Sequence, residues 1–375
     1  MMRVEFFRHN VGEQDITNVV DVLNSIFLTT GQVVKNFEEN LARYLSCREV
    51  VGVTSCTAAL HLCLLAWGVG PGDEVITSPM SFCATSNAVL HTGAMPVFVD
   101  AEESTGNINA ELIEEKITNK TKAILPVHLY GQMCDMKKIR QIADKHNLIV
   151  IEDAAHCIEG FRDGIKVGEL GDAACFSFYA TKNITSGEGG AIAVHDAKKA
   201  EQLAMLRSHG IDRTAADRYT KKYQHWDMPI LGWKYNMDNI QAALLIGQLA
   251  RIDELWEKRN GHATIYEDAF SSITGLNLMK NASSNVRHAR HLFTINVPGA
   301  KRDAILYALQ EKGIGVAVNY RAIHLLKYYR NNFGYREGNF PVAEMIGNST
   351  ISLPLYPSLT SEEIHYVIKT VKEVV

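Results

Sequence analysis

The stretch Ala173-Ala174-Cys175-Phe176-Ser177-Phe178-Tyr179-Ala180-Thr181-Lys182-Asn183 carries the most information about how this chain folds. Its apolar first half predicts a buried strand, and Lys182 follows in a polar turn that leads into Gly187-Glu188-Gly189-Gly190. Upstream, the apolar run over residues 148–151 predicts a second buried strand, which delivers Asp153 just beyond its end. Ligands of an open parallel sheet bind at the edge where its strands end, so we expect Lys182 and Asp153 to share one site.

A lysine and a carboxylate at two strand ends match the protein groups that pyridoxal phosphate needs. The amine of Lys182 would form the Schiff base, and the acid of Asp153 would keep the pyridine nitrogen protonated. A buried salt bridge or a metal site is the competing explanation for Asp153. Apolar neighbours predict a lowered pKa for Lys182, so that part of the amine is neutral and can later serve as a base. A single loop lysine is ordinarily a solvated charge, so the hypothesis depends on the whole set.

Four further residues or segments near strand ends favour the same cofactor, and three of them have a simpler alternative. Ser55-Cys56-Thr57-Ala58 joins a strand to a helix, where N–H groups and hydroxyls can bind a phosphate or form an ordinary N-cap. Phe82 can stack on a pyridine ring or belong to the core. His156 can hydrogen-bond the phenolate oxygen of the cofactor or be a helical histidine satisfied by the backbone. Ser177 can reach the phosphate.

Other kinds of site find little support in the sequence. Gly187-Glu188-Gly189-Gly190 lacks the spacing of a dinucleotide fingerprint or a P-loop, which argues against an NAD-dependent oxidoreductase. His288 and His291 could share a helix face, but strand-like residues follow and no third ligand is evident, so we expect no metal site. The seven cysteines are scattered, no pair has zinc-ligand spacing, and they indicate buried thiols.

The composition is that of a globular protein. The 375 residues suggest two to three domain-sized units, and 46% apolar residues supply a substantial core. A net charge of −4 without a basic block argues against nucleic acid or an anionic membrane as a partner. Neither a long apolar run nor the apolar core of a signal peptide is visible, so we expect a cytoplasmic protein.

Between about residues 50 and 195, short apolar runs alternate with amphipathic segments. This pattern predicts an α/β fold with a mainly parallel central sheet and helices on both faces. Helices fit between the strands, for example over residues 58–67 and 136–146, and the first fifty residues form at least two more. The expected strands are 50–54, 74–77, 96–99, 123–127, 148–152, 173–178 and 191–194.

The second half of the chain has a different pattern. Apolar residues at helical spacing predict one long helix over about 238–270 that links two domains. Beyond it, a polar loop at 277–289 precedes a smaller α+β domain. Its expected strands are 291–297 and 315–319, and its expected helices are 302–311 and 360–373. We therefore expect a large domain over residues 1–250 and a small domain over residues 251–375.

Many short motifs, in order and over nearly the whole length, resemble the DegT/StrS nucleotide-sugar aminotransferases, which are fold-type I pyridoxal-phosphate enzymes. Many members have glutamine at position 156. With histidine there, this chain resembles the subset of enzymes that make UDP-4-amino-4-deoxyarabinose and 4-amino-4,6-dideoxyhexosamines. Asn239 stands where the family usually has an acidic residue. The motifs are Phe27-Leu28-Thr29-Thr30-Gly31, Ser55-Cys56-Thr57-Ala58-Ala59-Leu60-His61, Gly72-Asp73-Glu74-Val75-Ile76, Pro126-Val127-His128-Leu129-Tyr130-Gly131, Ile151-Glu152-Asp153-Ala154-Ala155-His156, Lys182-Asn183, Leu206-Arg207-Ser208-His209-Gly210, Gly232-Trp233-Lys234-Tyr235-Asn236-Met237 and Ser352-Leu353-Pro354-Leu355-Tyr356-Pro357.

The resemblance implies a role for each candidate residue. Lys182 would carry the cofactor and Asp153 would hold its pyridine nitrogen. Asn236 would reach the phosphate bound in the other subunit of a homodimer, so the active sites would be shared. The remaining expected cofactor contacts are Thr57, Ala58 and Ser177 at the phosphate, Phe82 on the ring and His156 at the phenolate. The sugar nucleotide would meet Thr29, Thr30, His324 and Tyr328.

The resemblance also implies an activity. The chain would convert a nucleotide-linked 4-keto sugar, most readily a UDP-sugar, into the 4-amino sugar, in the biosynthesis of lipopolysaccharide, another surface glycan or an antibiotic sugar. Glutamate would donate the amine, and pyridoxamine phosphate would be the intermediate form of the cofactor. A 3-keto-sugar aminotransferase, a pyridoxal-phosphate sugar dehydratase and a non-catalytic cofactor-binding regulator stay open as alternatives. The dehydratase branch has histidine in place of Lys182, so the lysine favours amine transfer.

Overall fold

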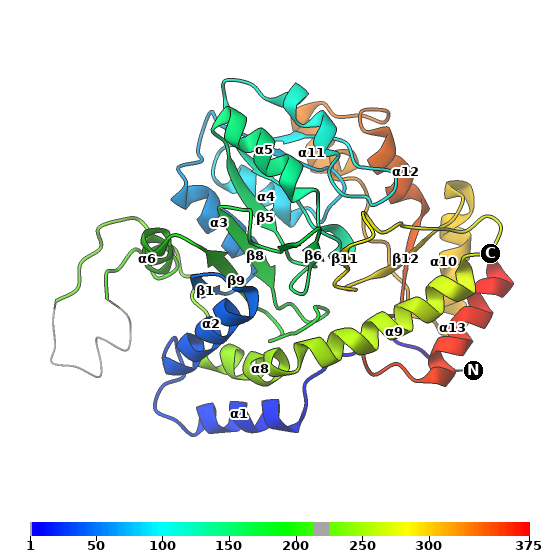
Figure 1. Cartoon of the computed structure of the whole chain (residues 1–375), viewed down its shortest axis with the longest axis horizontal. Coiled ribbons are helices and arrows are strands. Elements are labelled where there is room, and N and C mark those ends of the chain that lie inside the picture. Colours follow the sequence, from blue (N-terminus) through cyan, green and yellow to red (C-terminus); the bar gives the residue numbers. More distant parts are fainter. Residues whose placement is uncertain (1, 214–224) are drawn as a thin grey trace.

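The computed structural model describes residues 2–213 and 225–375 and has a seven-stranded sheet at its centre (Figure 1). Four neighbouring pairs in this sheet are parallel, and β9 alone runs antiparallel to both of its neighbours. The α/β fold with a mainly parallel sheet is therefore confirmed. In spatial order the strands are β1 (Glu49–Val53), β9 (Gly190–Val194), β8 (Ala173–Ser177), β5 (Ile149–Asp153), β4 (Thr121–Leu125), β2 (Glu74–Thr77) and β3 (Met95–Phe98).

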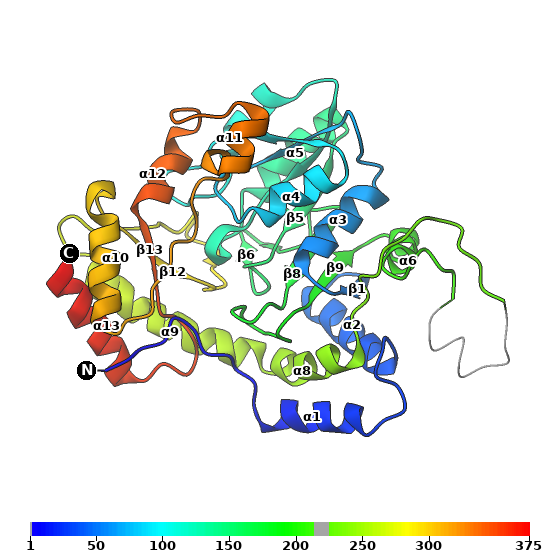
Figure 2. The ribbon, with the colours of Figure 1, turned by 180° about the vertical axis from the view of Figure 1, so that it is seen from behind.

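Helices cover both faces of this sheet, as Figures 1 and 2 show from opposite sides. Successive strand residues point to opposite faces, so Ala174 joins one apolar cluster while Cys175 joins the other. On one face lie α2 (Gln32–Leu45), α5 (Met136–His146) and α8 (Asn239–Ala250), and on the other lie α3 (Cys56–Ala66), α4 (Ala84–His91) and α6 (Ala197–Leu206).

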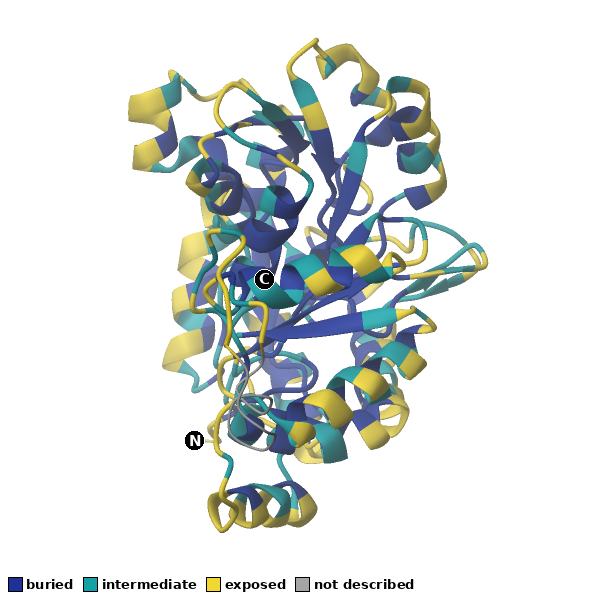
Figure 3. Cartoon of the chain, turned by 90° about the vertical axis from the view of Figure 1, so that its left-hand side faces the viewer, coloured by how far each residue is buried: buried dark blue, intermediate teal, exposed yellow. Residues whose placement is uncertain are grey.

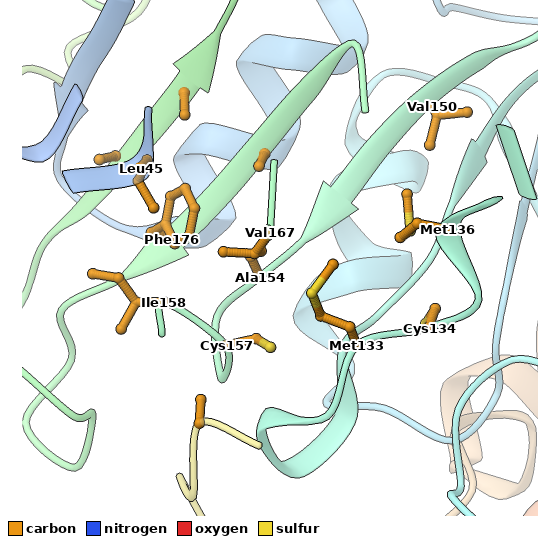
Figure 4. Packing of buried hydrophobic residues seen from close by; sticks show 14 of the residues in the cluster. Leu45, Met133, Cys134, Met136, Val150, Ala154, Cys157, Ile158, Val167 and Phe176 are labelled. Atoms are coloured by element: carbon orange, nitrogen blue, oxygen red, sulfur yellow. The ribbon is translucent and has the colours of Figure 1, made fainter. Parts of the chain in front are cut away.

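The first of these clusters is densely packed. Figure 4 shows Phe176 of β8 and Val150 of β5 together with Met136 at the start of α5. Burial on both faces explains why the strands are continuous apolar runs instead of alternating ones, and Figure 3 shows the strands as the most buried part of the chain.

The sheet register brings the ends of several strands to one edge. Val53, the last residue of β1, pairs with Gly190, the first residue of β9. Gly190 also pairs with Ser177, the last residue of β8, because β9 is antiparallel to both neighbours. On the far side of β8, Asp153 ends β5 opposite Cys175. Segments that follow β1, β5 and β8 therefore emerge side by side.

The predicted single helix over 238–270 is wrong in one respect. It consists of α8 and α9 (Ile252–Phe270), which are separated by Arg251 at φ −114° and ψ 19°. The guanidinium of Arg251 turns toward the start of α1 (Glu13–Leu23), where it pairs with Asp15 in the first turn and donates to the carbonyl of Asn10, just before the helix, at 2.8 Å. The division of the chain at residue 250 stays a prediction.

The C-terminal part contains a three-stranded antiparallel sheet of β10 (Asn277–Leu278), β12 (Phe293–Asn296) and β13 (Thr350–Leu353). Residues of β12 and β13 share one apolar cluster with the helices of this part. These are α10 (Arg302–Glu311) and α13 (Ser361–Val374). Two short helices, α11 (Lys327–Phe333) and α12 (Pro341–Ser349), complete this part, and β6 (Phe161–Arg162), β7 (Ile165–Lys166) and β11 (Val286–Arg287) form a small separate sheet.

The strand predicted at 315–319 is absent from the described structure. Ile314 pairs with Val4 and Ala317 pairs with Ser352, each as an isolated bridge. Because the segment changes partner within three residues, no continuous ladder forms. The polar stretch 277–289, predicted as a loop, contains the two-residue strands β10 and β11.

Within residues 2–213 and 225–375, no helix combines the length and the apolar character that a membrane span requires.

The carboxylate of Asp15 is fully buried and depends on Arg251 for its counter-charge. Removing one partner of such a pair leaves an uncompensated charge. We therefore expect Arg251→Met to lower the free energy of unfolding by about 3 kcal/mol in urea titrations. Lys258→Met, which removes the exposed i,i+4 partner of Glu254, should cost less than about 0.5 kcal/mol. Equal losses in the two variants would contradict this account of Asp15.

Candidate active site

A cavity of about 550 Å³ lies at the edge of the sheet where β1, β5 and β8 end. Six of the residues predicted from the sequence meet in its wall. They are Thr57, Phe82, Asp153, His156, Ser177 and Lys182. The structure thus brings together residues that are up to 125 positions apart, from Thr57 to Lys182.

The carboxyl group of Asp153 is buried in this cavity. One oxygen accepts a hydrogen bond from the Thr85 hydroxyl at 2.7 Å, and the other accepts the N–H of Ala155 at 3.1 Å. Burial raises the pKa of Asp153, although both hydrogen bonds and the charge of Lys182 act against this. No described lysine or arginine forms an ion pair with it, so the carboxylate is short of a cationic partner.

The amine of Lys182 faces the same cavity, and burial lowers its pKa to about 8. The negative charge of Asp153 limits that fall. Its Nζ lies 3.4 Å from Nε2 of His291, a residue from the segment before β12. A substantial fraction of this amine is therefore neutral near physiological pH, as a nucleophile or a proton acceptor requires.

His156 lies in a turn after β5, so the alternative of a helical histidine is wrong. Its Nδ1 accepts the N–H of Tyr130 at 3.2 Å, and its Nε2 lies 3.1 Å from the hydroxyl of Tyr320. Burial and the nearby charge of Lys182 lower the pKa of His156 well below its usual value. The imidazole is therefore neutral and carries its proton on Nε2.

The segment after β1 has the geometry of an anion site combined with an N-cap. The hydroxyl of Ser55 accepts the N–H of Ala58 at 3.1 Å, so this predicted phosphate contact is used for capping, and Ala58 does not line the cavity. The first two N–H groups of α3, from Cys56 and Thr57, have no acceptor within the helix and start at the cavity wall. A helix N-terminus of this kind stabilises a phosphate.

Gly190 explains the glycine run after Lys182. A Cβ at Gly190 would lie 2.4 Å from the carbonyl carbon of Ser55 and 2.6 Å from the amide nitrogen of Cys56. Only glycine allows β9 to pass this close to the start of α3. The run therefore closes the backbone around the N-terminus of α3.

Phe82 and Ser177 both line the cavity. The ring of Phe82 is more than half exposed, and its centroid lies 5.6 Å from that of Tyr320. It is therefore a cavity wall and not a core residue. The hydroxyl of Ser177 accepts the N–H of Tyr179 at 3.4 Å at the end of β8.

Five other predicted residues do not line the cavity. The side-chain amide of Asn236 donates to the hydroxyl of Thr30 at 2.7 Å, and Thr29 is exposed beside them. His324 is buried, 2.9 Å from the carboxylate of Glu344. Tyr328 is exposed on α11.

Three residues of the site escaped prediction. Thr85 holds the carboxylate of Asp153, His291 contacts the amine of Lys182, and Tyr320 contacts His156. His291 lies in a polar run of the sequence, but that pattern by itself suggests only a metal motif. Tyr320 follows a segment predicted as a strand, and nothing local distinguishes Thr85 from other helix threonines.

The model of the DegT/DnrJ/EryC1/StrS aminotransferase family matches residues 9–372. The chain belongs to this family. It is 40% identical to the spore coat polysaccharide biosynthesis protein SpsC of Bacillus subtilis, over 97% of this chain and 95% of the relative. It is 36% identical to the UDP-4-amino-4-deoxy-L-arabinose–oxoglutarate aminotransferase of Shewanella sediminis, over 98% and 97% of the two chains.

A solved structure gives the same result. The putative sugar aminotransferase Spr1654 of Streptococcus pneumoniae, in a form with pyridoxamine phosphate, superposes with a TM-score of 0.94 at 32% identity, over 99% of this chain and 98% of the other. A form of it with pyridoxal phosphate gives 0.93. The chain has the fold of the fold-type I sugar aminotransferases. It is a pyridoxal-phosphate-dependent sugar aminotransferase.

The residues of the cavity fit this coenzyme. The buried carboxylate of Asp153 lacks a cation, which a protonated pyridine nitrogen would supply. The amine of Lys182 has the lowered pKa that reaction with an aldehyde requires. The start of α3 offers N–H groups to a phosphate. All three features converge on one cavity, so the observed donor set agrees with the family.

The pKa of Lys182 predicts how fast the coenzyme binds. Only the neutral amine attacks an aldehyde, so the rate of binding to the coenzyme-free chain should rise about tenfold per pH unit up to about pH 8 and then level off. Stopped-flow absorbance in the visible band measures this rate. Nα-acetyl-lysine is the control, and its rate should keep rising to about pH 10. The same high-pH rise in the protein would contradict the lowered pKa.

Proposed function

We propose that this aminotransferase moves an amino group from glutamate to C-4 of a nucleotide-linked 4-keto sugar, with a UDP-sugar as the preferred substrate. The observation that carries the proposal is the meeting of Lys182 and Asp153 in one cavity, because these two groups perform amino transfer on pyridoxal phosphate. The choice of a UDP-linked 4-amino sugar, and of oxoglutarate as the partner product, is based on the name of the Shewanella relative. The relative SpsC supports a role in polysaccharide biosynthesis.

Each residue of the cavity has a separate role in this reaction. When bound, pyridoxal phosphate supplies an aldehyde that takes up the amino group and a ring that accepts the electron pair of the broken C–H bond. The amine of Lys182 takes the proton from that carbon and returns it one position further along, which a pKa near 8 permits. Asp153 keeps the ring nitrogen protonated, and the Nε2–H of His156, which faces the hydroxyl of Tyr320, would be shared with or passed to a phenolate oxygen. Phe82 covers the ring, and Thr57 and Ser177 hold the phosphate.

The charges in the cavity support a homodimer with shared sites. Of the described residues in its wall, Lys182 is the only lysine or arginine, although a phosphate, a nucleotide diphosphate and two glutamate carboxylates have to bind. We therefore expect further donors from a second subunit, and Asn236, beside Thr30 and outside the cavity of its own chain, is suited to reach a partner's phosphate. In this arrangement Thr29, Thr30, His324 and Tyr328 contact the sugar nucleotide.

The surface of α1 also favours association. Ile16, Val20 and Leu23 repeat at helical spacing, and all three are exposed, as are Ile26 and Leu28 in the segment that follows. A group of exposed apolar side chains on neighbouring segments, here next to Thr30, is typical of a subunit interface.

A substrate screen tests the proposed activity. The chain loaded with pyridoxamine phosphate should convert UDP-linked 4-keto sugars faster than GDP- or dTDP-linked ones, with return of the visible absorbance band. NMR of the product should place the new amine on C-4. Lys182→Ala should slow turnover by at least about a thousandfold, whereas the cavity-remote Lys258→Ala should leave it unchanged. Amine on C-3, or a product that has lost a hydroxyl without gaining an amine, would refute the proposal.

Mixed dimers test the shared site. Asn236→Asp should repel a phosphate, and Lys182→Ala removes the nucleophile, so each homodimer should be inactive. Coexpressed with two different tags, the two chains form a mixed dimer in which one site keeps both Lys182 and Asn236. A one-to-one mixture should therefore recover about a quarter of the wild-type rate. Without recovery, Asn236 does not act across the subunit interface.

A further inference from the structure

A line of buried polar groups leads from α9 to the active-site lysine. Arg259 of α9 forms an ion pair with Glu159, which lies in the turn after β5. The other oxygen of Glu159 accepts the side-chain amide of Asn183 at 2.7 Å. Asn183 in turn contacts Nδ1 of His291 at 3.3 Å, and Nε2 of His291 lies 3.4 Å from Nζ of Lys182. The line therefore ends at the amine that reacts.

The orientation of the Asn183 amide is fixed by its partners. Its Nδ2 donates to Glu159 and also to the backbone carbonyl of Ala289, at 2.9 Å. A carbonyl can only accept, so the NH₂ group has to face Ala289, and the amide oxygen has to face His291. The ion pair with Arg259 keeps Glu159 in place as the second acceptor.

This orientation fixes the tautomer of His291. The oxygen of Asn183 can only accept, so Nδ1 of His291 has to carry a proton. Burial lowers the pKa of His291 well below its usual value, and the positive charges of Lys182 and Arg259 add to this. The ring is therefore neutral, and its Nε2 presents a lone pair to the amine of Lys182.

The neighbouring imidazole has the opposite tautomer. The rings of His156 and His291 lie 4.3 Å apart, and Nδ1 of His156 accepts the N–H of Tyr130. His156 thus directs an N–H toward Tyr320, whereas His291 directs a lone pair toward Lys182. Two similar side chains in contact have different hydrogen-bonding roles because their Nδ1 atoms have different partners, a backbone N–H for His156 and the side-chain oxygen of Asn183 for His291.

We propose that His291 is a positioning residue for Lys182, whose amine donates a hydrogen bond to the Nε2 lone pair of His291, and that Asn183, Glu159 and Arg259 fix the tautomer on which this contact depends. The proposal adds to the proposed function and takes from it the role of Lys182. An acceptor at this place stabilises the protonated amine, which offsets part of the effect of burial. It also directs one N–H bond of the neutral amine away from the cavity, so that the nitrogen lone pair is free to face the substrate.

The first test reads the tautomers directly. In the full-length coenzyme-free chain labelled with ¹⁵N-histidine, long-range ¹H–¹⁵N spectra distinguish an Nδ1–H ring from an Nε2–H ring. We expect Nδ1–H for His291 and Nε2–H for His156, with each signal assigned by its loss in a His→Gln variant. An Nε2–H or doubly protonated His291 at neutral pH would overturn the proposal. No substrate is involved, so this result does not depend on the amino-transfer reaction.

The second test uses two substitutions that separate the two nitrogens. His291→Asn keeps a donor near Asn183 but has no atom near Lys182, whereas His291→Gln keeps an acceptor near Lys182. Competitive acetylation followed by mass spectrometry gives the pKa of Lys182 in the coenzyme-free chain. It should fall by about one pH unit from about 8 in His291→Asn and change little in His291→Gln.

His288→Asn is the matched control, because it truncates another buried imidazole three residues away that bonds to the N–H of Arg290. The pKa of Lys182 should stay unchanged in this variant. A rise in His291→Asn would show that His291 repels the protonated amine instead of accepting from it, and no change would show that the contact has no energetic effect. Either result contradicts the proposal.

Discussion

Burial of two opposite charges at one edge of the sheet is the constraint on which this structure depends. Desolvation raises the pKa of Asp153 and lowers the pKa of Lys182, and each charge only partly relieves the other. Neither group is satisfied by the chain alone, so both favour a ligand that brings a cation to the acid and an aldehyde to the amine. The coenzyme of this family has these two groups at separate positions of one ring. Binding of the coenzyme would therefore offset the desolvation cost of burying Asp153 and Lys182.

The backbone around this pair is arranged by a single antiparallel strand. Because β9 lies between β1 and β8, its first residue meets the ends of both neighbours. Gly190 at this position allows the start of α3 to approach within contact distance of β9. The last glycine of the run after Lys182 therefore acts through packing, and not as part of a phosphate-binding fingerprint.

A second set of buried polar groups connects to Lys182 through His291. Arg259 pairs with Glu159, Glu159 accepts from Asn183, and Asn183 contacts His291. Each contact restricts the orientation of the next side chain. The network ends at the edge of the reactive cavity. Since Arg259 lies on α9 and Glu159 follows β5, the network also fixes the C-terminal half of the chain against the sheet that carries the coenzyme site.

The amino-acid sequence by itself determined the strands, their burial and the residues at their ends. Long apolar runs are local signals, and Asp153 and Lys182 are conspicuous because a charge directly after such a run is costly to bury. The same local reasoning failed where a long-range partner decides the structure. Arg251 interrupts the predicted long helix as it reaches Asp15, and the segment 315–319 has no partner for a continuous ladder.

Only the tertiary structure decided which side chains complete the site. Thr85 reaches Asp153 across 68 positions, and His291 reaches Lys182 across 109. Neither contact leaves a periodic or compositional signal, because it depends on how the loops and segments next to the sheet pack against its edge. The tautomer of His291 is even harder to predict from the sequence. It follows from the side-chain amide of Asn183, whose orientation is set by Glu159 and Ala289. Residue type fixes what a group can donate or accept, and the fold fixes what it faces.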